Sequence, residues 1–124
     1  MNYIFDTNAI IDLLEGKLSP AAINILTNVI AEVSVISKIE LLGYHRINLH
    51  QQTTIENFLK KSILHPLNDN IVDECIKIRK QINIKTPDAI IAATAIVQNL
   101  TLFSRNLKDF STIPGLTIID PYTL

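Results

Sequence analysis

Five short stretches rich in β-branched and aromatic residues alternate along the chain with longer segments of helical periodicity. The expected strands are YIF (3–5), VSVI (33–36), ILHP (63–66), LTLF (100–103) and LTIID (116–120). Strands that alternate with helices are typical of parallel sheets, because each parallel connection needs a crossover segment. The pattern therefore predicts an α/β three-layer sandwich with a central, mostly parallel five-stranded sheet flanked by helices.

The size and composition of the chain fit one compact domain over residues 1–124. A chain of 124 residues buries roughly two thirds of the surface that its unfolded form exposes. Hydrophobic residues make up 48% and charged residues 19%, which excludes a disordered or low-complexity chain. The formal charge is −1, so a nucleic-acid partner has to be held by a local basic patch.

Neither secretion nor membrane insertion is indicated by the sequence. The N-terminal MNYIFD lacks a basic region, and Asp6 and Asp12 interrupt its apolar stretch. The apolar run AIIAATAIV is far shorter than the ~20 residues of a membrane span. Cys75 recurs with Ile71 and Ile78 at helical spacing and is expected to be a core thiol. We expect a cytoplasmic protein without membrane contact.

Several helix starts can be read from polar residues that precede apolar periodicity. Ser19 before Pro20 has the pattern of an N-cap followed by the first helical residue, and Thr86 before Pro87 repeats it. The other expected caps are Asp6, Asp69 and a capping box over Ser37–Glu40.

Three acids stand where the sheet and helices would bring them to one edge. Asp6 follows the first strand, Glu40 follows the second, and Asp88 opens a later helix. Sites in open parallel sheets form outside the carboxyl ends of the strands. Each acid alone has a structural explanation: Asp6 and Glu40 can take part in helix caps, and Asp88 meets the positive end of a helix dipole, which is worth about 0.3–1 kcal/mol. Together they would repel one another unless a cation joins them.

Such a cluster favours a hard divalent cation. Carboxylate, amide and hydroxyl oxygens suit Mg²⁺ or Mn²⁺. Zinc is disfavoured, because His45, His50 and His65 are scattered and one cysteine cannot build a thiolate site.

Four ordered segments carry a resemblance to a known family. They are FDTNAIIDLL (5–14), ISKIELLGY (36–44), TPDAIIAATA (86–95) and LFSRNLKDFSTIPGL (102–116). In order and spacing they resemble the PIN-domain family, and most specifically the VapC-type toxins of type II toxin–antitoxin modules. The resemblance implies a parallel sheet between helices and a Mg²⁺- or Mn²⁺-dependent endoribonuclease.

The resemblance also assigns residues. Asp6, Glu40 and Asp88 match the three metal-coordinating acids of the family. At the fourth position, which is often Asp, this chain has Asn106, with Asp109 three residues on. We expect Asn106 to be the inner contact and Asp109 an outer or helix-capping acid. Three further residues match small polar positions that line the site: Thr7, Asn8 and Ser104.

Basic residues accompany each acidic segment and are expected to contact RNA phosphates. They are Lys38, Arg46, Lys85, Arg105 and Lys108. Tyr44 is the aromatic residue expected near the site, whereas Phe110 is expected in the core. The resemblance further implies a structured RNA substrate such as tRNA, a homodimer and a cognate antitoxin. The helices over 20–30 and 50–61 are the expected partner surfaces.

Other functions fit the sequence less well. A PIN fold kept as a catalytically silent binding module would retain the acids for capping alone, without binding a metal. A haloacid-dehalogenase-type phosphatase would need a second Asp two residues after Asp6, where this chain has Asn8. A phospho-receiver domain would need adjacent acids after the first strand and a Lys after the last, and the sequence has neither.

Overall fold

The computed structural model describes residues 2–124 and has a parallel sheet at its centre. The strands are β1 (Tyr3–Phe5), β2 (Glu32–Ser34), β3 (Ile63–His65), β4 (Thr101–Phe103) and β5 (Thr117–Ile119). Their order across the sheet is β3-β2-β1-β4-β5, and every pairing among them is parallel. The predicted sheet is therefore confirmed, with strands somewhat shorter than the sequence suggested.

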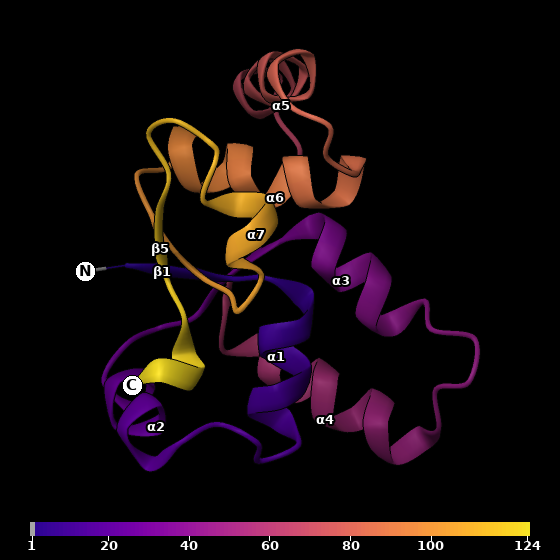
Figure 1. Ribbon diagram of the computed structural model, residues 1–124. Helices are drawn as coiled ribbons and strands as arrows, with labels where there is room; N and C mark the ends of the chain where they lie inside the picture. The colour runs from indigo at the N-terminus through magenta and orange to yellow at the C-terminus, as the bar shows by residue number, and fades with distance from the viewer. Residues whose placement is uncertain (1) are drawn as a thin grey trace.

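Helices lie on both faces of this sheet (Figure 1). They are α1 (Thr7–Leu14), α2 (Pro20–Thr27), α3 (Val35–Leu42), α4 (Leu49–Lys60), α5 (Asp69–Gln81), α6 (Thr86–Val97) and α7 (Leu107–Phe110), with a 3₁₀ turn η1 (Pro121–Thr123) near the end. None of the helices within residues 2–124 is long and apolar enough to cross a membrane.

Alternation along the central strands creates two hydrophobic cores, one on each face. Ile4 and Leu102 pack with α5, α6 and α7 in a core that includes Cys75 and Phe110. The alternate residues Phe5 and Phe103 lie in the second core, which α1 and α4 help to close. Cys75 and Phe110 are buried as expected. The two cores make the molecule a three-layer sandwich.

Of the five helix caps read from the sequence, two are confirmed, two are displaced by one residue and one by three residues. Asp6 and Ser19 cap α1 and α2 as expected. For α5, however, the cap is Asn68 and not Asp69, because the Asn68 side chain accepts from the Ile71 N–H group. In α6, Lys85 is the N-cap residue and Thr86 is already helical.

The start of α3 corrects the expected capping box over Ser37–Glu40. Strand β2 ends at Ser34, where its pairing with His65 of β3 ends. Ser34 then caps α3, and its hydroxyl accepts from the Ile36 N–H group at 3.2 Å. Ser37 and Glu40 therefore lie inside the helix, so Glu40 is free of a capping role.

Candidate active site

The ends of several segments meet at the carboxyl edge of the sheet, around α1, α3, α6 and α7 (Figure 1). Asp6 follows β1 directly, and Ser104 follows β4. Glu40 lies in α3, and Asp88 is in the first turn of α6. The topology thus brings the sequence-predicted acids to the same edge from distant parts of the chain.

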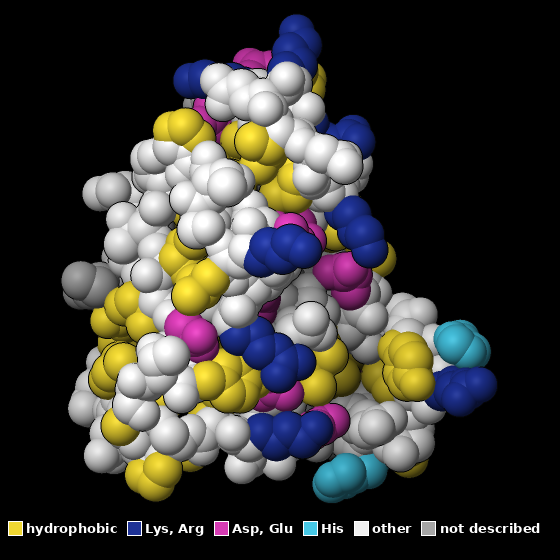
Figure 2. All heavy atoms as spheres, in the orientation of Figure 1, with side chains coloured by type: hydrophobic (Ala, Val, Ile, Leu, Met, Phe, Trp, Pro, Cys, Tyr) yellow, Lys and Arg dark blue, Asp and Glu magenta, His cyan; other side chains and the backbone are white. Residues whose placement is uncertain are grey.

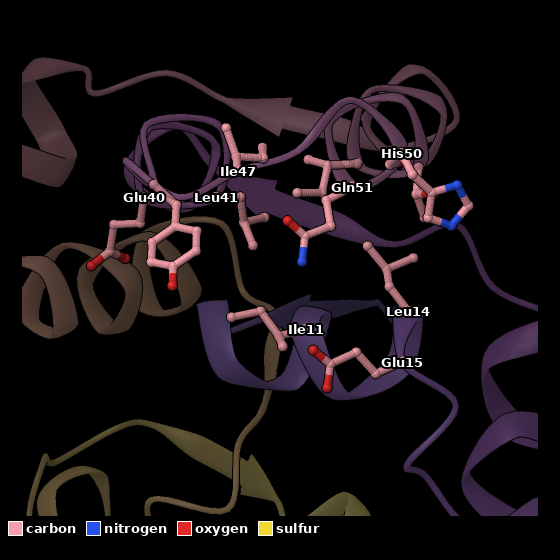
Figure 3. Close-up of a pocket in the computed structure, with 11 residues that line it drawn as sticks. Ile11, Leu14, Glu15, Glu40, Leu41, Ile47, His50 and Gln51 are labelled. Atoms are coloured by element: carbon pink, nitrogen blue, oxygen red, sulfur yellow. The ribbon is translucent and has the colours of Figure 1, made fainter.

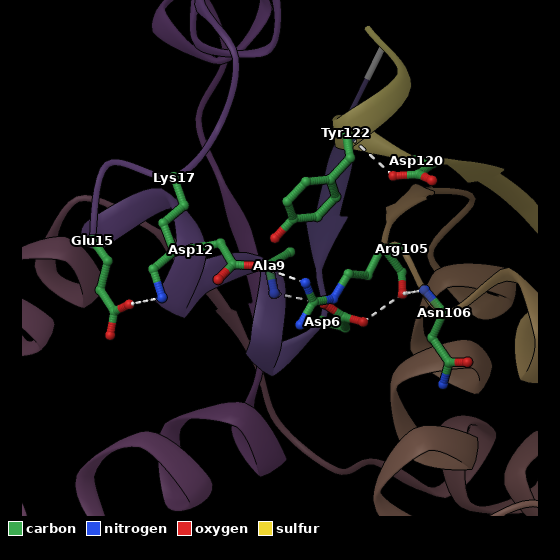
Figure 4. Close-up of polar contacts among 10 residues, drawn as sticks. Asp6, Ala9, Asp12, Glu15, Lys17, Arg105, Asn106, Asp120 and Tyr122 are labelled. Atoms are coloured by element: carbon green, nitrogen blue, oxygen red, sulfur yellow. Dashed lines mark hydrogen bonds and ion pairs between the residues drawn. The ribbon is translucent and has the colours of Figure 1, made fainter.

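Asp6 is the buried centre of this edge, with 7% of its surface exposed. Its Oδ1 accepts a hydrogen bond from the Ala9 N–H group at 2.8 Å, and its Oδ2 accepts one from the Ser104 hydroxyl at 2.5 Å (Figure 4). Burial raises the pKa of Asp6, although these two hydrogen bonds and the charge of Arg105 oppose it. Asp6 is therefore oriented on both oxygens and poorly hydrated.

Thr7 connects Glu40 to the same edge. The Thr7 hydroxyl donates to Glu40 Oε1 at 2.7 Å, and its oxygen lies 3.0 Å from Ser37 Oγ. Ser37 is fully buried beneath this contact. Thr7 therefore holds one oxygen of the Glu40 carboxylate through a hydrogen bond between α1 and α3.

The pKa of Asp88 is influenced by the other acids at this edge. Its pKa is raised first by burial, and then by the negative charges of Asp6, Asp109 and Glu40, while Lys85 opposes the shift. Asp88 is therefore partly buried and lies in the electrostatic field of the other three acids.

These acids are not arranged as a closed cation cage. Within residues 2–124, no group of three or more Asp, Glu, His or Cys side chains is close enough to hold a metal ion. Asp6 and Glu40 are instead held by hydrogen bonds to Ser104 and Thr7. The donor set still fits Mg²⁺ or Mn²⁺, since it consists of oxygens and carries an unneutralised negative charge that a cation would relieve.

The fourth position is a linked pair. Asn106 Oδ1 caps α7 by accepting from the Asp109 N–H group at 3.4 Å, and Asn106 Nδ2 donates to Asp109 Oδ2 at 3.0 Å. Of the two roles expected for Asp109, helix capping is wrong, because Asn106 supplies the cap of α7, and the outer role stays a prediction. The Asp109 carboxylate accepts from Asn106, and its negative charge contributes to the raised pKa of Asp88.

The remaining predicted site residues are distributed unevenly. Asn8 and Lys38 are exposed, and Arg46 lies in the loop after α3 and not on that helix. Lys85 and Arg105 lie closer, since their charges oppose the rise that burial causes in the pKa values of Asp88 and Asp6 respectively. Figure 2 shows Lys and Arg side chains interleaved with Asp and Glu side chains across this face.

A groove of about 480 Å³ begins beside Glu40 and runs between α1, α3 and α4 (Figure 3). Its walls are mostly apolar and include Ile11, Leu14, Leu41, Ile47 and Ile55. The groove therefore lies along one of the two helices expected to meet a partner. Tyr44, the expected aromatic residue near the site, also lines it and is exposed.

Two residues near the site were not predicted as functional. Asp12 is buried in α1, and Tyr122 lies in η1 with its ring facing Arg105. The only sequence signal for Asp12 was an acid inside an otherwise apolar helix, IIDLL. No pattern in the sequence points to Tyr122.

Comparison with known proteins places the chain in a family. The PIN domain model matches residues 3–116. Ribonuclease VapC of Rickettsia bellii is 31% identical, and the match covers 96% of both chains. A toxin–antitoxin complex from Klebsiella pneumoniae contains a chain with 30% identity and a TM-score of 0.78, with 98% of both chains covered. The structure of VapBC-1 from nontypeable Haemophilus influenzae contains a chain with 28% identity and a TM-score of 0.81, with 100% of both chains covered. The chain therefore belongs to the PIN-domain family, and within it to the VapC type.

Proposed function

We propose that the protein is the ribonuclease toxin of a VapC-type module, a Mg²⁺- or Mn²⁺-dependent endoribonuclease that cleaves RNA phosphodiester bonds. The observation that carries this proposal is the placement of Asp6, Glu40 and Asp88 at one edge of the sheet, in a chain that the PIN domain model matches over residues 3–116. Uncompensated carboxylates in one place are a feature of sites that bind a cation. The curated relatives bear the name of ribonuclease, which supports the same reaction.

In this proposal Asp6, Glu40 and Asp88 hold the cation, and Asn106 with Asp109 forms the fourth position. Ser104 and Thr7 direct the carboxylates of Asp6 and Glu40. When bound, the cation would supply the means to lower the pKa of a water molecule and to neutralise charge on the scissile phosphate. No side-chain nucleophile is needed, which fits the oxygen-only site.

The same proposal includes two protein partners. Solved relatives are toxin–antitoxin complexes, and we propose that a cognate antitoxin occupies the groove that begins at Glu40. We also propose a homodimer and a structured RNA substrate such as tRNA.

A catalytically silent binding module is the second candidate, because Asp6 serves as a helix cap and the acids form no closed cage. Metal binding separates the two functions. A scaffold would bind neither Mg²⁺ nor Mn²⁺.

The proposed activity is tested by sequencing RNA 5′ ends after brief expression of the wild-type chain and of Asp88→Asn. We expect new 5′ ends at a small set of sites with the wild type and none with the variant. Equal sets of ends from both proteins would refute the proposal.

The fourth position gives a prediction of moderate size. We expect Asp109→Asn to lower kcat/KM for RNA by about 10-fold, since one partly exposed charge is removed. Asn106→Asp should strengthen binding of a second Mn²⁺ ion, because it adds a negative charge beside the site. Initial rates and calorimetric Mn²⁺ titration measure the two effects. Loss of all cleavage in a folded Asp109→Asn protein, with Asn106→Ala unchanged, would assign the inner contact to Asp109.

A further inference from the structure

Asp12 is a buried carboxylate without an adequate partner. It lies on α1 with 6% of its surface exposed, and its Oδ2 has no hydrogen-bond partner within residues 2–124. The Nη1 atom of Arg105 lies 3.9 Å from that oxygen (Figure 4). This distance is too long for a hydrogen bond but short enough for strong attraction between the charges. Buried acids are normally paired, so the position of Asp12 calls for a reason.

Arg105 is held from a second side by the C-terminal turn. Its guanidinium carbon lies 5.2 Å from the centre of the Tyr122 ring, within the range of a cation–π contact. The turn itself is fixed, because Asp120 accepts from the Tyr122 N–H group at 2.9 Å and Ser19 donates to the Leu124 carbonyl at 3.2 Å. The Arg105 side chain is thus positioned by Asp12 of α1 and Tyr122 of η1.

The guanidinium of Arg105 lies beside the proposed catalytic site, and its N–H groups are available to bind a ligand. Arg105 directly follows Ser104, and its charge lowers the pKa of Asp6 against the larger effect of burial. Its side chain is 59% exposed, and its nearest carboxylate within residues 2–124, that of Asp12, lies beyond hydrogen-bond distance at 3.9 Å. Lys17, another cation near Asp12, is already paired with Glu15 at 2.6 Å.

We propose that Asp12 and Tyr122 are positioning residues that hold Arg105 at the rim of the acidic site, where its guanidinium binds the RNA phosphate next to the one that is cut. A planar guanidinium matches two phosphate oxygens at once, and fixing it beforehand reduces the rotamer freedom lost on binding. Asp12 supplies charge from the buried side without using the donors. This inference rests on the proposed function, since it assigns the contact to an RNA substrate.

The test is a double-mutant cycle of Asp12→Asn and Arg105→Ala. Cleavage of a fluorescein-labelled hairpin RNA with Mn²⁺ gives kcat and KM, and anisotropy of the same RNA in EDTA gives Kd at several KCl concentrations. We expect Arg105→Ala to raise KM and Kd about 10-fold with little change in kcat, and to reduce the salt slope by about one. In the wild-type background, Asp12→Asn should raise KM and Kd about 3-fold. In the background of Arg105→Ala, the same substitution should leave KM and Kd unchanged.

Tyr122 gives an independent pair of variants at the surface. Tyr122→Leu removes the ring and should behave as Asp12→Asn does, whereas Tyr122→Phe keeps the aromatic face and should match the wild type. This pair decides the inference if the buried Asp12→Asn substitution prevents folding, which thermal unfolding would show.

Two results would overturn the inference. One is an unchanged salt slope in Arg105→Ala, and the other is an equal effect of Asp12→Asn with and without Arg105. A wild-type chain that binds the hairpin without cutting it would refute the proposed function, while the same cycle measured on Kd still decides the role of Asp12. A chain that neither binds nor cuts RNA would refute both.

Discussion

Asp88→Asn is expected to lower kcat/KM for RNA cleavage at least ~1,000-fold while leaving the metal-free protein as stable as the wild type or more so. The loss corresponds to about 4 kcal/mol of transition-state stabilisation, the scale of a metal ligand. The gain in stability follows because burial and three nearby acids disfavour the ionised Asp88 carboxylate. It is limited to about 1 kcal/mol, since the charge also favours the start of α6. Initial rates and urea unfolding in EDTA measure both effects.

Asp69→Asn is the matched control for this experiment. Asp69 is also an acid in the first turn of a helix, but it is exposed on α5 and is not among the charges that act on Asp88. The control should keep wild-type activity and lose the small helix-dipole contribution of roughly 0.3–1 kcal/mol. If Asp88→Asn destabilised the metal-free protein by more than this control does, the repulsion inferred at the site would be absent.

Removal of divalent ions is the second change expected to have a large effect. Cleavage should stop in EDTA and return with Mn²⁺ or Mg²⁺, because the carboxylates alone offer neither a nucleophile nor positive charge to the phosphate. Added ions should also raise the melting temperature of the wild type. An ion at 10 times its Kd stabilises a protein by about 1.4 kcal/mol, or roughly 5 °C for a domain of this size.

Differential scanning fluorimetry with 0–10 mM Mn²⁺ measures this shift, and Asp88→Asn is the control that should show much less of it. Ca²⁺ serves as a further comparison, since it binds oxygen ligands but tolerates looser geometry. If Mn²⁺, Mg²⁺ and Ca²⁺ all leave the melting temperature of the wild type unchanged, the silent binding module is favoured.

The fold could be predicted largely from local patterns, whereas the starts of α3, α5 and α6 could not. The strand β1 and the cap at Asp6 depend on neighbouring residues, and both were predicted correctly. The sequence VSVIS contains two serines that can each cap a helix. Pairing of β2 with β3 decides between them, since it ends at Ser34. The choice between the two serines therefore depends on β3, which is distant in sequence.

In the site, too, some features could be predicted from local sequence and others depend on contacts between distant residues. A family motif and strand ends predicted Asp6, Glu40 and Asp88, and the topology brings all three to one edge. The contacts that orient them join residues far apart, as when Ser104 reaches Asp6 across 98 positions. Spacing cannot reveal such pairs, because they depend on how β1 and β4 lie side by side.

The nature of the RNA ends produced by the purified chain tests the central claim most directly. If the acids bind a cation that activates water, cleavage needs no 2′-hydroxyl of the substrate. A labelled hairpin RNA cut in Mn²⁺ should therefore yield only phosphate and hydroxyl ends, and a single 2′-deoxy substitution at the scissile nucleotide should still allow cutting. Neither product should appear in EDTA or with Asp88→Asn. Fragments ending in 2′,3′-cyclic phosphate, formed equally with and without EDTA, would contradict the metal-dependent site.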